Sequence, residues 1–548
     1  MNVSHPTRTD RTTVLIAGGG PAGLAAAAEL GLRGVDCLLL EPRAEVSHRR
    51  PRAKTTSVRT MEHLRRWGVA GALRAAAPLP VAWSQRVTFC HSLTGARITD
   101  FENAFGLTTD RDERFAEAGQ QVPQPVVEQV LRDHLSTLPN VELRLGHSAG
   151  ALTQDDDGVT VTVHTTGDPA DGETTYTIRA AYLLGCDGAA GPVREQIGAQ
   201  YVGRLDPRPN CNLVFHAPGL DPQLGPAVQY WVVGDRTSGL VGRLDLHGTW
   251  WAVIPGIEAE YGREHASELI TDLVGAEVEH TVLASDPWTA RMLVADAFRD
   301  RRVFLVGESA HVNPPWGGHG FNTCVGDAVN LGWKIAAVEQ GWAPPQLLDS
   351  YEPERRDVVE QTVASAESNM RALAGDLPRD QDAIQRLKRA EFHSLGLVLG
   401  YTYAHSPIIQ PCDTLNGSPV ATITNTDIAY TADVTGYQPT TAPGCRLPHA
   451  WLPDGSSLYD HLGPGFTLLG PEHPGTADLL ARARRHGIPL TVYTAPASYP
   501  WHREFLLVRP DQHVAGRAQD PADLDLDQAT GRSLTRTTTV GAPAKETP

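Results

Sequence analysis

Residues 13–41 read TVLIAGGGPAGLAAAAELGLRGVDCLLLE, and this stretch decides the fold. An apolar strand leads into the pattern GxGxxG at Gly18, Gly20 and Gly23, which is followed by an alanine-rich helix and a second apolar strand. Glycines at these positions permit a tight turn, a close approach of the backbone to a pyrophosphate, and close packing of helix against strand. The helix N-terminus carries a partial positive charge that favours phosphate. The stretch therefore predicts a dinucleotide-binding βαβ unit.

The second strand ends at Glu41, whose carboxylate can accept hydrogen bonds from the ribose hydroxyls of an adenosine. The pattern alone does not separate FAD from NAD. The sequence contains one GxGxxG of this kind. An enzyme that uses both nucleotides would therefore hold one of them permanently and meet the other transiently.

The amino-acid composition limits the classes of protein to which this chain can belong. The chain has 548 residues, of which 41% are hydrophobic and 20% charged, so we expect a globular protein of roughly two to four structural units. A formal net charge of -17 disfavours nucleic acid and anionic membranes as partners. No apolar run approaches the roughly 18–20 residues of a membrane span, and residues 1–13 have no apolar signal core. The seven cysteines are scattered without a CxxC pair, which predicts no metal site and a cytoplasmic location.

Two further strands end in glycine and an acid. Residues 180–194 read AAYLLGCDGAAGPVR and place Asp187 after the strand, while residues 302–308 read RVFLVGE and end at Glu308. Residues 307–336, GESAHVNPPWGGHGFNTCVGDAVNLGWKIA, then place a glycine- and proline-rich segment directly before an amphipathic helix. Such a segment suits a backbone that approaches a flat, charged group. The plain alternative is a surface loop before a helix.

These three motifs, in this order, resemble the FAD-dependent aromatic hydroxylases, which are class A flavoprotein monooxygenases of the p-hydroxybenzoate, phenol and polyketide hydroxylase type. The resemblance implies an α/β fold with a Rossmann-like FAD-binding domain, an inserted antiparallel-sheet substrate domain and a C-terminal thioredoxin-like domain. The limits we expect are 1–82, 118–200 and 288–400 for the FAD-binding domain, 83–117 and 201–287 for the substrate domain, 405–535 for the thioredoxin-like domain, and 536–548 for a disordered tail.

The resemblance also assigns roles around a noncovalently bound FAD. Glu308 would bond the ribityl chain, Pro315 would lie against the isoalloxazine face, and the amides from Gly318 to Asn322 would approach its pyrimidine edge. The helix expected at 325–340 would then pack against the nucleotide domain, with these residues largely inward: Val325, Ala328, Val329, Trp333 and Ile335. Arg52 would reach the pyrophosphate or the arriving NAD(P)H, unless it belongs to a solvated helix face; Gln124 would meet the cofactor, unless it only caps a helix. The residues predicted to hold FAD are Gly18, Gly20, Pro21, Ala22, Gly23, Glu41, Pro42, Arg43, Arg52, Gln124, Asp187, Gly307, Glu308, Pro315, Gly318, Gly320, Phe321 and Asn322.

Three positions depart from the usual family pattern. Glu308 stands where Asp is usual, Gly191 where Ser is usual, and Cys324 where Gly is common. Glu is one methylene longer than Asp, so the contact with the ribityl chain shifts or a water fills the gap.

Residues 201–287 contain short apolar strands separated by Gly, Pro and Asp turns, at 212–218, 227–235, 238–245 and 248–256. In the family such a sheet forms the floor of the aromatic pocket. We name His216, Tyr230, Trp231 and Arg243 as pocket candidates from the strands, and Pro315 and Trp316 from the flavin loop. An aromatic strand residue is equally consistent with simple core packing, and no catalytic residue is assigned.

Beyond a Pro/Ser/Thr-rich linker that begins near residue 405, the chain predicts a βαβ–ββ order that resembles the thioredoxin-like C-terminal domain of the larger phenol and polyketide hydroxylases. It has no CxxC, so we expect it to pack against the rest of the chain or against a second copy in a homodimer rather than to do dithiol chemistry.

The resemblance implies a monooxygenase that takes hydride from NAD(P)H and uses O2, through a flavin C4a-hydroperoxide, to hydroxylate a phenolic or polyketide-like aromatic substrate. Two alternatives remain at this point. One is a Baeyer–Villiger or epoxidising enzyme on the same fold, and the other is a non-oxygenating FAD-binding oxidase or dehydrogenase. The sequence does not choose between NADH and NADPH, nor does it name the substrate.

Overall fold

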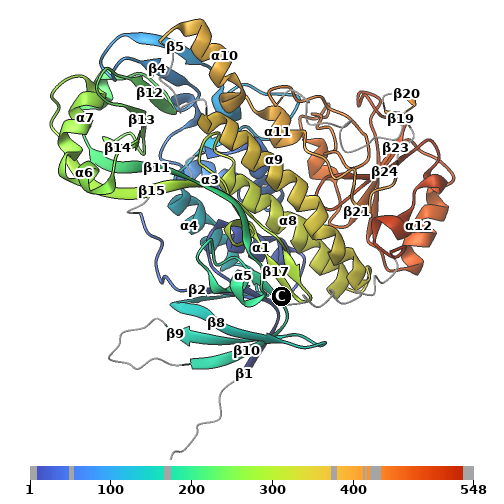
Figure 1. The fold of residues 1–548 in the computed structure, drawn as a ribbon. Coiled ribbons are helices and arrows are strands. Elements are labelled where there is room, and N and C mark those ends of the chain that lie inside the picture. The colour runs from blue at the N-terminus through green and yellow to red at the C-terminus, as the bar shows by residue number, and fades with distance from the viewer. Residues whose placement is uncertain are drawn as a thin grey trace, which may run out of the picture.

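The computed structural model describes residues 9–48, 55–165, 175–371, 379–411, 414–415, 418–419 and 434–534. Arg52 and the tail predicted at 536–548 lie outside these residues. Figure 1 shows a parallel sheet, an antiparallel sheet at the upper left and a C-terminal unit at the right, with helices α8 (Gly320–Glu339) and α9 (Tyr351–Arg371) between them. The predicted α/β fold class is confirmed.

The first sheet has the strand order β16-β17-β10-β1-β2-β7, with the β8–β9 hairpin attached to β10. Neighbouring strands are parallel from β17 to β7. Because β1, β2, β10 and β17 run in the same direction, their carboxyl ends meet at one edge, which is where ligands bind in such sheets. Its strands are β1 Thr9–Ala17, β2 Cys37–Glu41, β7 Val141–Leu145, β8 His147–Gln154, β9 Val159–Thr165, β10 Thr175–Gly185, β16 Arg299–Asp300 and β17 Val303–Leu305.

Helix α1 (Pro21–Leu32) leaves the end of β1 through the glycine turn and is buried along most of its length. A Cβ on Gly23 would overlap the carbonyl oxygen of Gly18, so only glycine permits this packing of helix on turn. The other helices of the described residues are α2 Val58–Arg66, α3 Ala70–Ala76, α4 Gln124–Leu135, α5 Pro192–Gln196, α6 Ala259–Glu264, α7 Ala266–Val274, α10 Gln381–Phe392, α11 Leu395–Leu399, α12 Thr476–Arg485 and α13 Leu526–Ala529. None of these helices is long and apolar enough to cross a membrane.

The second sheet has the order β18-β15-β11-β14-β13-β12-β4-β5. The apolar runs named from the sequence become β12, β13, β14 and the end of β11. Strand β15 and the first half of β11 were not predicted; most of their side chains are exposed or half-buried, and each segment contains an Asp-Pro pair, which is typical of a turn. The strands are β4 Val87–Cys90, β5 Arg97–Phe101, β11 Tyr201–His216, β12 Gln229–Val233, β13 Ser238–Arg243, β14 Thr249–Pro255, β15 Thr281–Ala295 and β18 His311–Val312.

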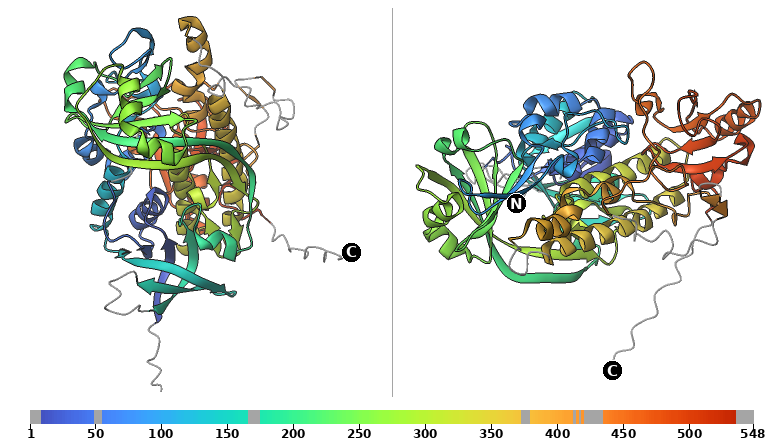
Figure 2. Two further views of the ribbon diagram at one scale, coloured as in Figure 1. Left: turned by 60° about the vertical axis from the view of Figure 1, so that its left-hand side comes forward. Right: turned by 90° about the horizontal axis from the view of Figure 1, so that it is seen from above.

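Strands β11 and β15 form a long antiparallel ribbon that curves from the second sheet toward the first (Figure 2). The domain limit expected at 287/288 falls inside β15. The domain limits therefore stay a prediction, although the sheets themselves are distinct. Short strand pairs complete the set: β3 Thr55–Thr56 with β6 Gln120–Gln121, and β19 Thr414–Leu415 with β20 Ser418–Pro419.

Helix α8 begins at Gly320, five residues before the start expected at Val325. Its apolar residues are buried as predicted, but they face two different neighbours. Val325 and Ile335 belong to the core of the first sheet. Trp333 instead packs with Trp342 and Phe466 in the core of the C-terminal unit, so its predicted packing against the nucleotide domain is wrong.

The C-terminal unit has the sheet order β22-β21-β23-β24, with β21 parallel to β22 and the other pairs antiparallel. This is the βαβ–ββ order that the sequence predicts, with α12 between β21 and β22. The strands are β21 Phe466–Gly470, β22 Leu490–Thr494, β23 Phe505–Val508 and β24 Val514–Ala518.

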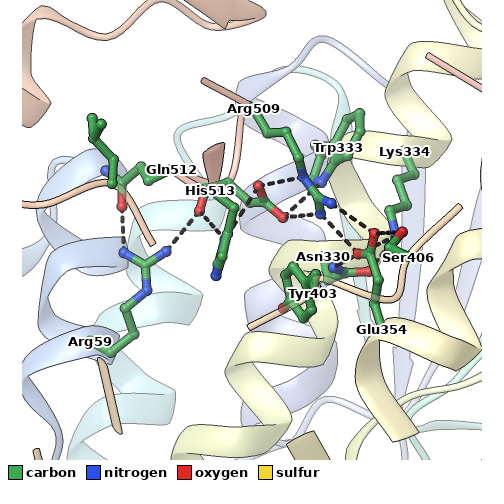
Figure 3. Close-up of polar contacts among 12 residues, drawn as sticks. Arg59, Asn330, Trp333, Lys334, Glu354, Tyr403, Ser406, Arg509, Gln512 and His513 are labelled. Carbon is green, nitrogen blue, oxygen red and sulfur yellow. Dashed lines mark hydrogen bonds and ion pairs between the residues drawn. The ribbon is translucent and has the colours of Figure 1, made fainter. Parts of the chain in front are cut away.

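A buried network of polar side chains joins this unit to the helices of the first domain (Figure 3). Glu354 accepts hydrogen bonds from Lys334 Nζ at 2.7 Å and from both Nη atoms of Arg509 at 2.7 and 2.9 Å. Asp511 accepts from Arg509 and from Trp333 Nε1 at 3.2 Å. We call this set the junction network; its members are Arg59, Asn330, Trp333, Lys334, Glu354, Ser406, Arg509, Asp511 and Gln512.

Candidate active site

A cavity of about 860 Å³ opens at the carboxyl edge of the first sheet and reaches the second sheet. Its lining comes from the glycine turn after β1, the ends of β2 and β10, the loop before α8, and strands β12 to β14. The predicted residues that line it are Gly18, Gly20, Pro21, Ala22, Glu41, Pro42, Arg43, Gln124, Asp187, Glu308, Pro315, Trp316, Gly318, Gly320 and Phe321.

At one end of the cavity, the N-terminus of α1 faces the open space. Gly18 has φ of 107°, and a Cβ there would overlap the carbonyl of Cys186. A Cβ on Gly20 would meet nothing within 4 Å, and no side chain caps the helix at this residue. The free amides of the first turn are thus available to an anion such as a pyrophosphate.

Glu41 stands beside this turn and is itself held in place. Its Oε2 accepts from the Gly19 amide at 2.8 Å, and its Oε1 accepts from Arg43 Nε at 2.6 Å. Gln124 donates through Nε2 to Glu128 Oε1 at 2.6 Å, and Glu128 also lines the cavity. Glu128 was not predicted, because a buried acid one helical turn after Gln124 carries no motif of its own.

Asp187 lies at the end of β10 with one satisfied and one unsatisfied oxygen. Oδ2 accepts from the Val193 amide at 2.9 Å, whereas Oδ1 is buried without a hydrogen-bond partner among the described residues. Burial raises the pKa of this carboxyl. A buried acceptor that lines a cavity and lacks a partner is the signature of a group that awaits a donor on a ligand.

Gly191, one of the three departures from the family pattern, is explained by this carboxylate. A Cβ at residue 191 would overlap the Asp187 carboxyl group, so the serine that is usual here would displace it. The other departures also line the cavity. Glu308 is exposed, and Cys324 is a buried thiol whose pKa burial raises well above its usual value, so it stays protonated.

The loop before α8 brings two glycines to the cavity, beside the side chains of its other lining residues. Gly317 and Gly318 have φ of 93° and 69°, which residues with a side chain rarely adopt. Asn322 lies behind the loop and holds it: Nδ2 donates to the Gly318 carbonyl at 2.7 Å, and Oδ1 accepts from the Ser57 amide at 2.9 Å. Asn322 is therefore placed as a support of the loop and not in the cavity lining.

Gly23 and Gly307 are also outside the lining, because both are needed for packing behind it. A Cβ on Gly307 would lie 2.9 Å from the Cβ of Ala22, so glycine lets α1 and the third motif approach each other. The Gly307 amide donates to Asp327 Oδ2 at 3.2 Å. Asp327 also accepts from His311 Nε2 and Arg355 Nε, each at 2.7 Å, and thereby ties the third motif to α8 and α9.

The pocket candidates named from the strands are not in the cavity lining. Tyr230 lies on the opposite face of the sheet, in a core with Trp250. Arg243 is buried over the Trp250 ring at 4.3 Å and donates to the Leu224 carbonyl at 2.9 Å. His216 ends β11, where it pairs with Thr249 and Thr281.

Trp231 has the orientation that we expected, but its ring is covered. It stacks on Phe89 at 5.3 Å, and Lys388 Nζ lies 4.2 Å from the ring centroid. The lining residues from these strands are Gln229, Leu240, Trp251 and Val253. Strand alternation places Trp251 and Val253 on one face and Trp250 on the other, but the sequence does not say which face is which.

Two further lining residues, Phe105 and Glu391, come from segments without a motif, and a third, Asn313, belongs to the loop before α8 but was not named. Trp316, which was predicted, packs against Trp288 at 5.4 Å, and its Nε1 is buried without a hydrogen-bond partner in the described part of the chain. This part of the cavity is largely aromatic and aliphatic, with a few polar groups, as expected of a site for a flat organic molecule.

The residues present fit FAD. The N-termini of α1 and α8 both open into one cavity, and the loop between β18 and α8 brings glycine backbone to its wall. Asp187, whose Oδ1 has no hydrogen-bond partner among the described residues, also lines it. Helix N-termini favour phosphate and the negative charge of a reduced flavin.

Comparison with known proteins supports the fit of these residues to FAD. The family model described as FAD binding domain matches residues 11–366, and the model described as aromatic-ring hydroxylase, C-terminal, matches residues 440–537. The chain is 31% identical to 2,4-dichlorophenol 6-monooxygenase of Cupriavidus pinatubonensis, with 96% of this chain and 97% of that protein covered. It is 29% identical to a putative polyketide hydroxylase of Streptomyces halstedii, with 96% and 97% covered.

Solved structures show the same similarity. The complex of aklavinone-11 hydroxylase with FAD and aklavinone superposes with a TM-score of 0.79 at 27% identity, covering 95% of this chain and 97% of that one. RebC with bound 7-carboxy-K252c superposes with a TM-score of 0.83 at 30% identity, covering 95% and 98%. The resemblance drawn from the three motifs is thus confirmed, and the chain belongs to the family of FAD-dependent aromatic-ring hydroxylases.

Proposed function

We propose that the protein is an FAD-dependent monooxygenase that uses NAD(P)H and O2 to hydroxylate a phenolic or polyketide-like aromatic substrate. One observation carries this proposal. A single cavity connects the glycine turn of the nucleotide fold, through the backbone loop before α8, to an aromatic wall on the antiparallel sheet. A cofactor held at the first end would meet an aromatic compound held at the second.

In this proposal Gly18, Gly20 and the first turn of α1 hold the pyrophosphate, Glu41 meets the adenosine ribose, and Asp187 offers its unpartnered oxygen to a hydroxyl of the cofactor. When bound, FAD supplies hydride acceptance from NAD(P)H and the activation of O2. The chain supplies the glycine loop 317–318, whose backbone allows close approach, and the positive end of α8.

The substrate end needs to orient a ring and to exclude water. Trp251, Trp316, Leu240 and Val253 provide an apolar surface for this purpose. No nucleophilic side chain is required. The cysteines in the lining, Cys186 and Cys324, have pKa values that burial raises well above the usual range, which keeps them as thiols.

The other readings of the sequence are less well supported. Baeyer–Villiger or epoxidising chemistry and a non-oxygenating flavoprotein are not favoured, because the similar proteins are named as hydroxylases and monooxygenases. A homodimer and a cytoplasmic location stay predictions from the sequence.

The test is to record the visible spectrum of the purified protein and then to follow NADH or NADPH oxidation in air with a panel of phenols and polycyclic phenols. We expect flavin absorption, faster oxidation with one class of aromatic compound, and a product heavier by one oxygen atom. A colourless protein that takes up no FAD would contradict the cofactor assignment. Reduction without any oxygenated product would point to the non-oxygenating alternative.

A further inference from the structure

Helix α10 contributes one carboxylate to the cavity. Glu391 is 2% exposed to solvent and is among the residues that line the cavity. Its Oε2 accepts from Lys388 Nζ at 2.7 Å, and the carboxylate also accepts a hydrogen bond from the Gly317 amide. Burial raises the pKa of this carboxyl, whereas the ion pair with Lys388 favours its charged form. A buried acid beside a ligand cavity can complete its hydrogen bonding with a donor on a ligand.

The counter-ion of Glu391 lies away from the cavity. Lys388 is fully buried, is not among the lining residues, and sits under the Trp231 ring at 4.2 Å. A ligand in the cavity therefore meets the carboxylate and not the ammonium group. The Lys388–Glu391 pair has no net charge, but the group that a ligand in the cavity meets is a hydrogen-bond acceptor.

Apart from Lys388, the groups named around Glu391 are apolar or neutral. Gly317, which it holds, is flanked by Trp316, and Phe392 packs edge-on against Phe105, which lines the cavity. The second sheet adds the amide of Gln229. Among the described lining residues the one basic side chain is Arg43, which pairs with Glu41 at the nucleotide end.

We propose that Glu391 is the specificity-determining residue for the substrate: it accepts a hydrogen bond from a ring hydroxyl and selects uncharged phenolic compounds over aromatic carboxylates. This inference rests on the proposed function, since it assumes an aromatic substrate in this cavity. A hydroxyl gains a charge-assisted hydrogen bond to the carboxylate. A carboxylate in the same place meets a like charge in a water-poor site and has no hydrogen to donate.

The experiment uses the full chain loaded with FAD and a matched pair of ligands, 2-naphthol and 2-naphthoate, which share a ring system and differ in the recognised group. Binding is titrated by the change in flavin absorbance and by tryptophan fluorescence. The same ligands are then used to stimulate NAD(P)H oxidation. The proteins compared are the wild type, Glu391→Gln, Glu391→Asp and the control Asp382→Asn, which removes an exposed charge from the same helix.

We expect the wild type to bind 2-naphthol about tenfold or more tightly than 2-naphthoate. Glu391→Gln should lose about tenfold in affinity for 2-naphthol with little loss for 2-naphthoate, and the loss should appear in KM more than in kcat. Glu391→Asp keeps the charge and should keep part of the preference. Asp382→Asn should behave as the wild type.

Two results would overturn the inference: a wild type that prefers 2-naphthoate, or a Glu391→Gln variant with an unchanged ratio of affinities. A Glu391→Gln variant that loses FAD and both ligands together, without rescue by Glu391→Asp, would mean that Glu391 acts only by holding Gly317, which also overturns it. Failure of the proposed function gives a different result. In that case the wild type shows the 2-naphthol preference in binding, but neither ligand stimulates NAD(P)H oxidation.

Discussion

The cavity and the junction network both contain buried polar atoms, but they differ in how completely these atoms are hydrogen-bonded. In the junction network Glu354 receives five hydrogen bonds, from Lys334, Asn330, Ser406 and twice from Arg509. In the cavity Asp187 Oδ1 and Trp316 Nε1 have no partner among the described residues. A buried carboxylate saturated in this way holds a structure together, whereas unsatisfied groups beside a cavity are available to a ligand.

The two regions also differ in what they are made of. The cavity wall around the proposed cofactor includes glycines from three short local motifs, which are the turn after β1, the segment after β10 and the loop before α8. The junction network consists of long charged side chains from α2, α8, α9 and the loop between β23 and β24. Changes in the junction should therefore lower stability, and changes in the cavity should lower ligand affinity.

The largest effect is expected for Glu354→Gln. It leaves Lys334 buried without its counter-ion and Arg509 with Asp511 as its remaining carboxylate partner, which should lower the free energy of unfolding by about 3–5 kcal/mol. Urea denaturation followed by tryptophan fluorescence measures this. The control is Glu360→Gln, the same change at an exposed position of α9. Equal loss of stability in both variants would contradict the structural role of the junction network.

The second effect is on the pH dependence of stability. Burial alone would raise the pKa of Glu354, but Arg509 and Lys334 outweigh it and lower the pKa to about 2 from its usual 4.5. Because the folded-state pKa is depressed, the stabilisation is fully present above pH 4.5 and is lost as the pH falls toward 2, by about 3 kcal/mol.

Denaturation measured at several pH values between these limits tests this. Other buried acids contribute to the same window, among them Glu29 with a pKa lowered to about 2. The relevant quantity is therefore the difference between wild type and Glu354→Gln. This difference in the free energy of unfolding should shrink as the pH falls. A difference that stays constant would contradict the prediction.

The third effect is on cofactor affinity. Asp187→Asn keeps an oxygen for the Val193 amide but removes the charge that faces the cavity. Loss of one hydrogen bond to a charged group should weaken FAD binding by about 1.5–3 kcal/mol, which is roughly 10- to 150-fold in Kd. Titration of the FAD-free protein with FAD measures it.

Stability supplies the complementary readout for Asp187→Asn. The FAD-free variant should unfold within about 0.5 kcal/mol of the FAD-free wild type, because Oδ1 makes no hydrogen bond within the described protein. Folded Glu354→Gln should bind FAD as the wild type does. We assign stability to the junction network and ligand affinity to the cavity. An Asp187→Asn variant that lost stability but kept its affinity for FAD would contradict this assignment.

The smallest effect is expected for Trp316→Phe. The indole nitrogen has no partner to lose, so stability should change by less than about 1 kcal/mol. The ring contact with Trp288 is altered and one wall of the pocket retreats. Substrate KM should therefore rise by about two- to fivefold, equivalent to roughly 0.5–1 kcal/mol, as measured by steady-state kinetics. A stability loss comparable to that of Glu354→Gln would show that Trp316 is a core residue instead.

The pocket candidates show where prediction from sequence stops. The strands at 227–235, 238–245 and 248–256 were predicted, and so was their antiparallel sheet. The residues named on them were the large or charged ones, Tyr230 and Arg243, which form a core on the opposite face. Alternation along a strand separates Trp250 from Trp251, but both faces of this sheet are buried, so hydrophobicity does not tell them apart.

What the sequence determined by itself is local. The GxGxxG turn, the strand ends at Glu41 and Asp187, and the glycine loop at 317–318 each place their residues through φ angles, a short turn or the start of a helix, and these depend on neighbours in the chain. Only the tertiary structure decided which face of the second sheet lines the cavity, that Glu391 of α10 reaches it, and that Arg509 meets Glu354. Those contacts join segments far apart in the chain, and their geometry is set by packing, which leaves no local pattern in the sequence.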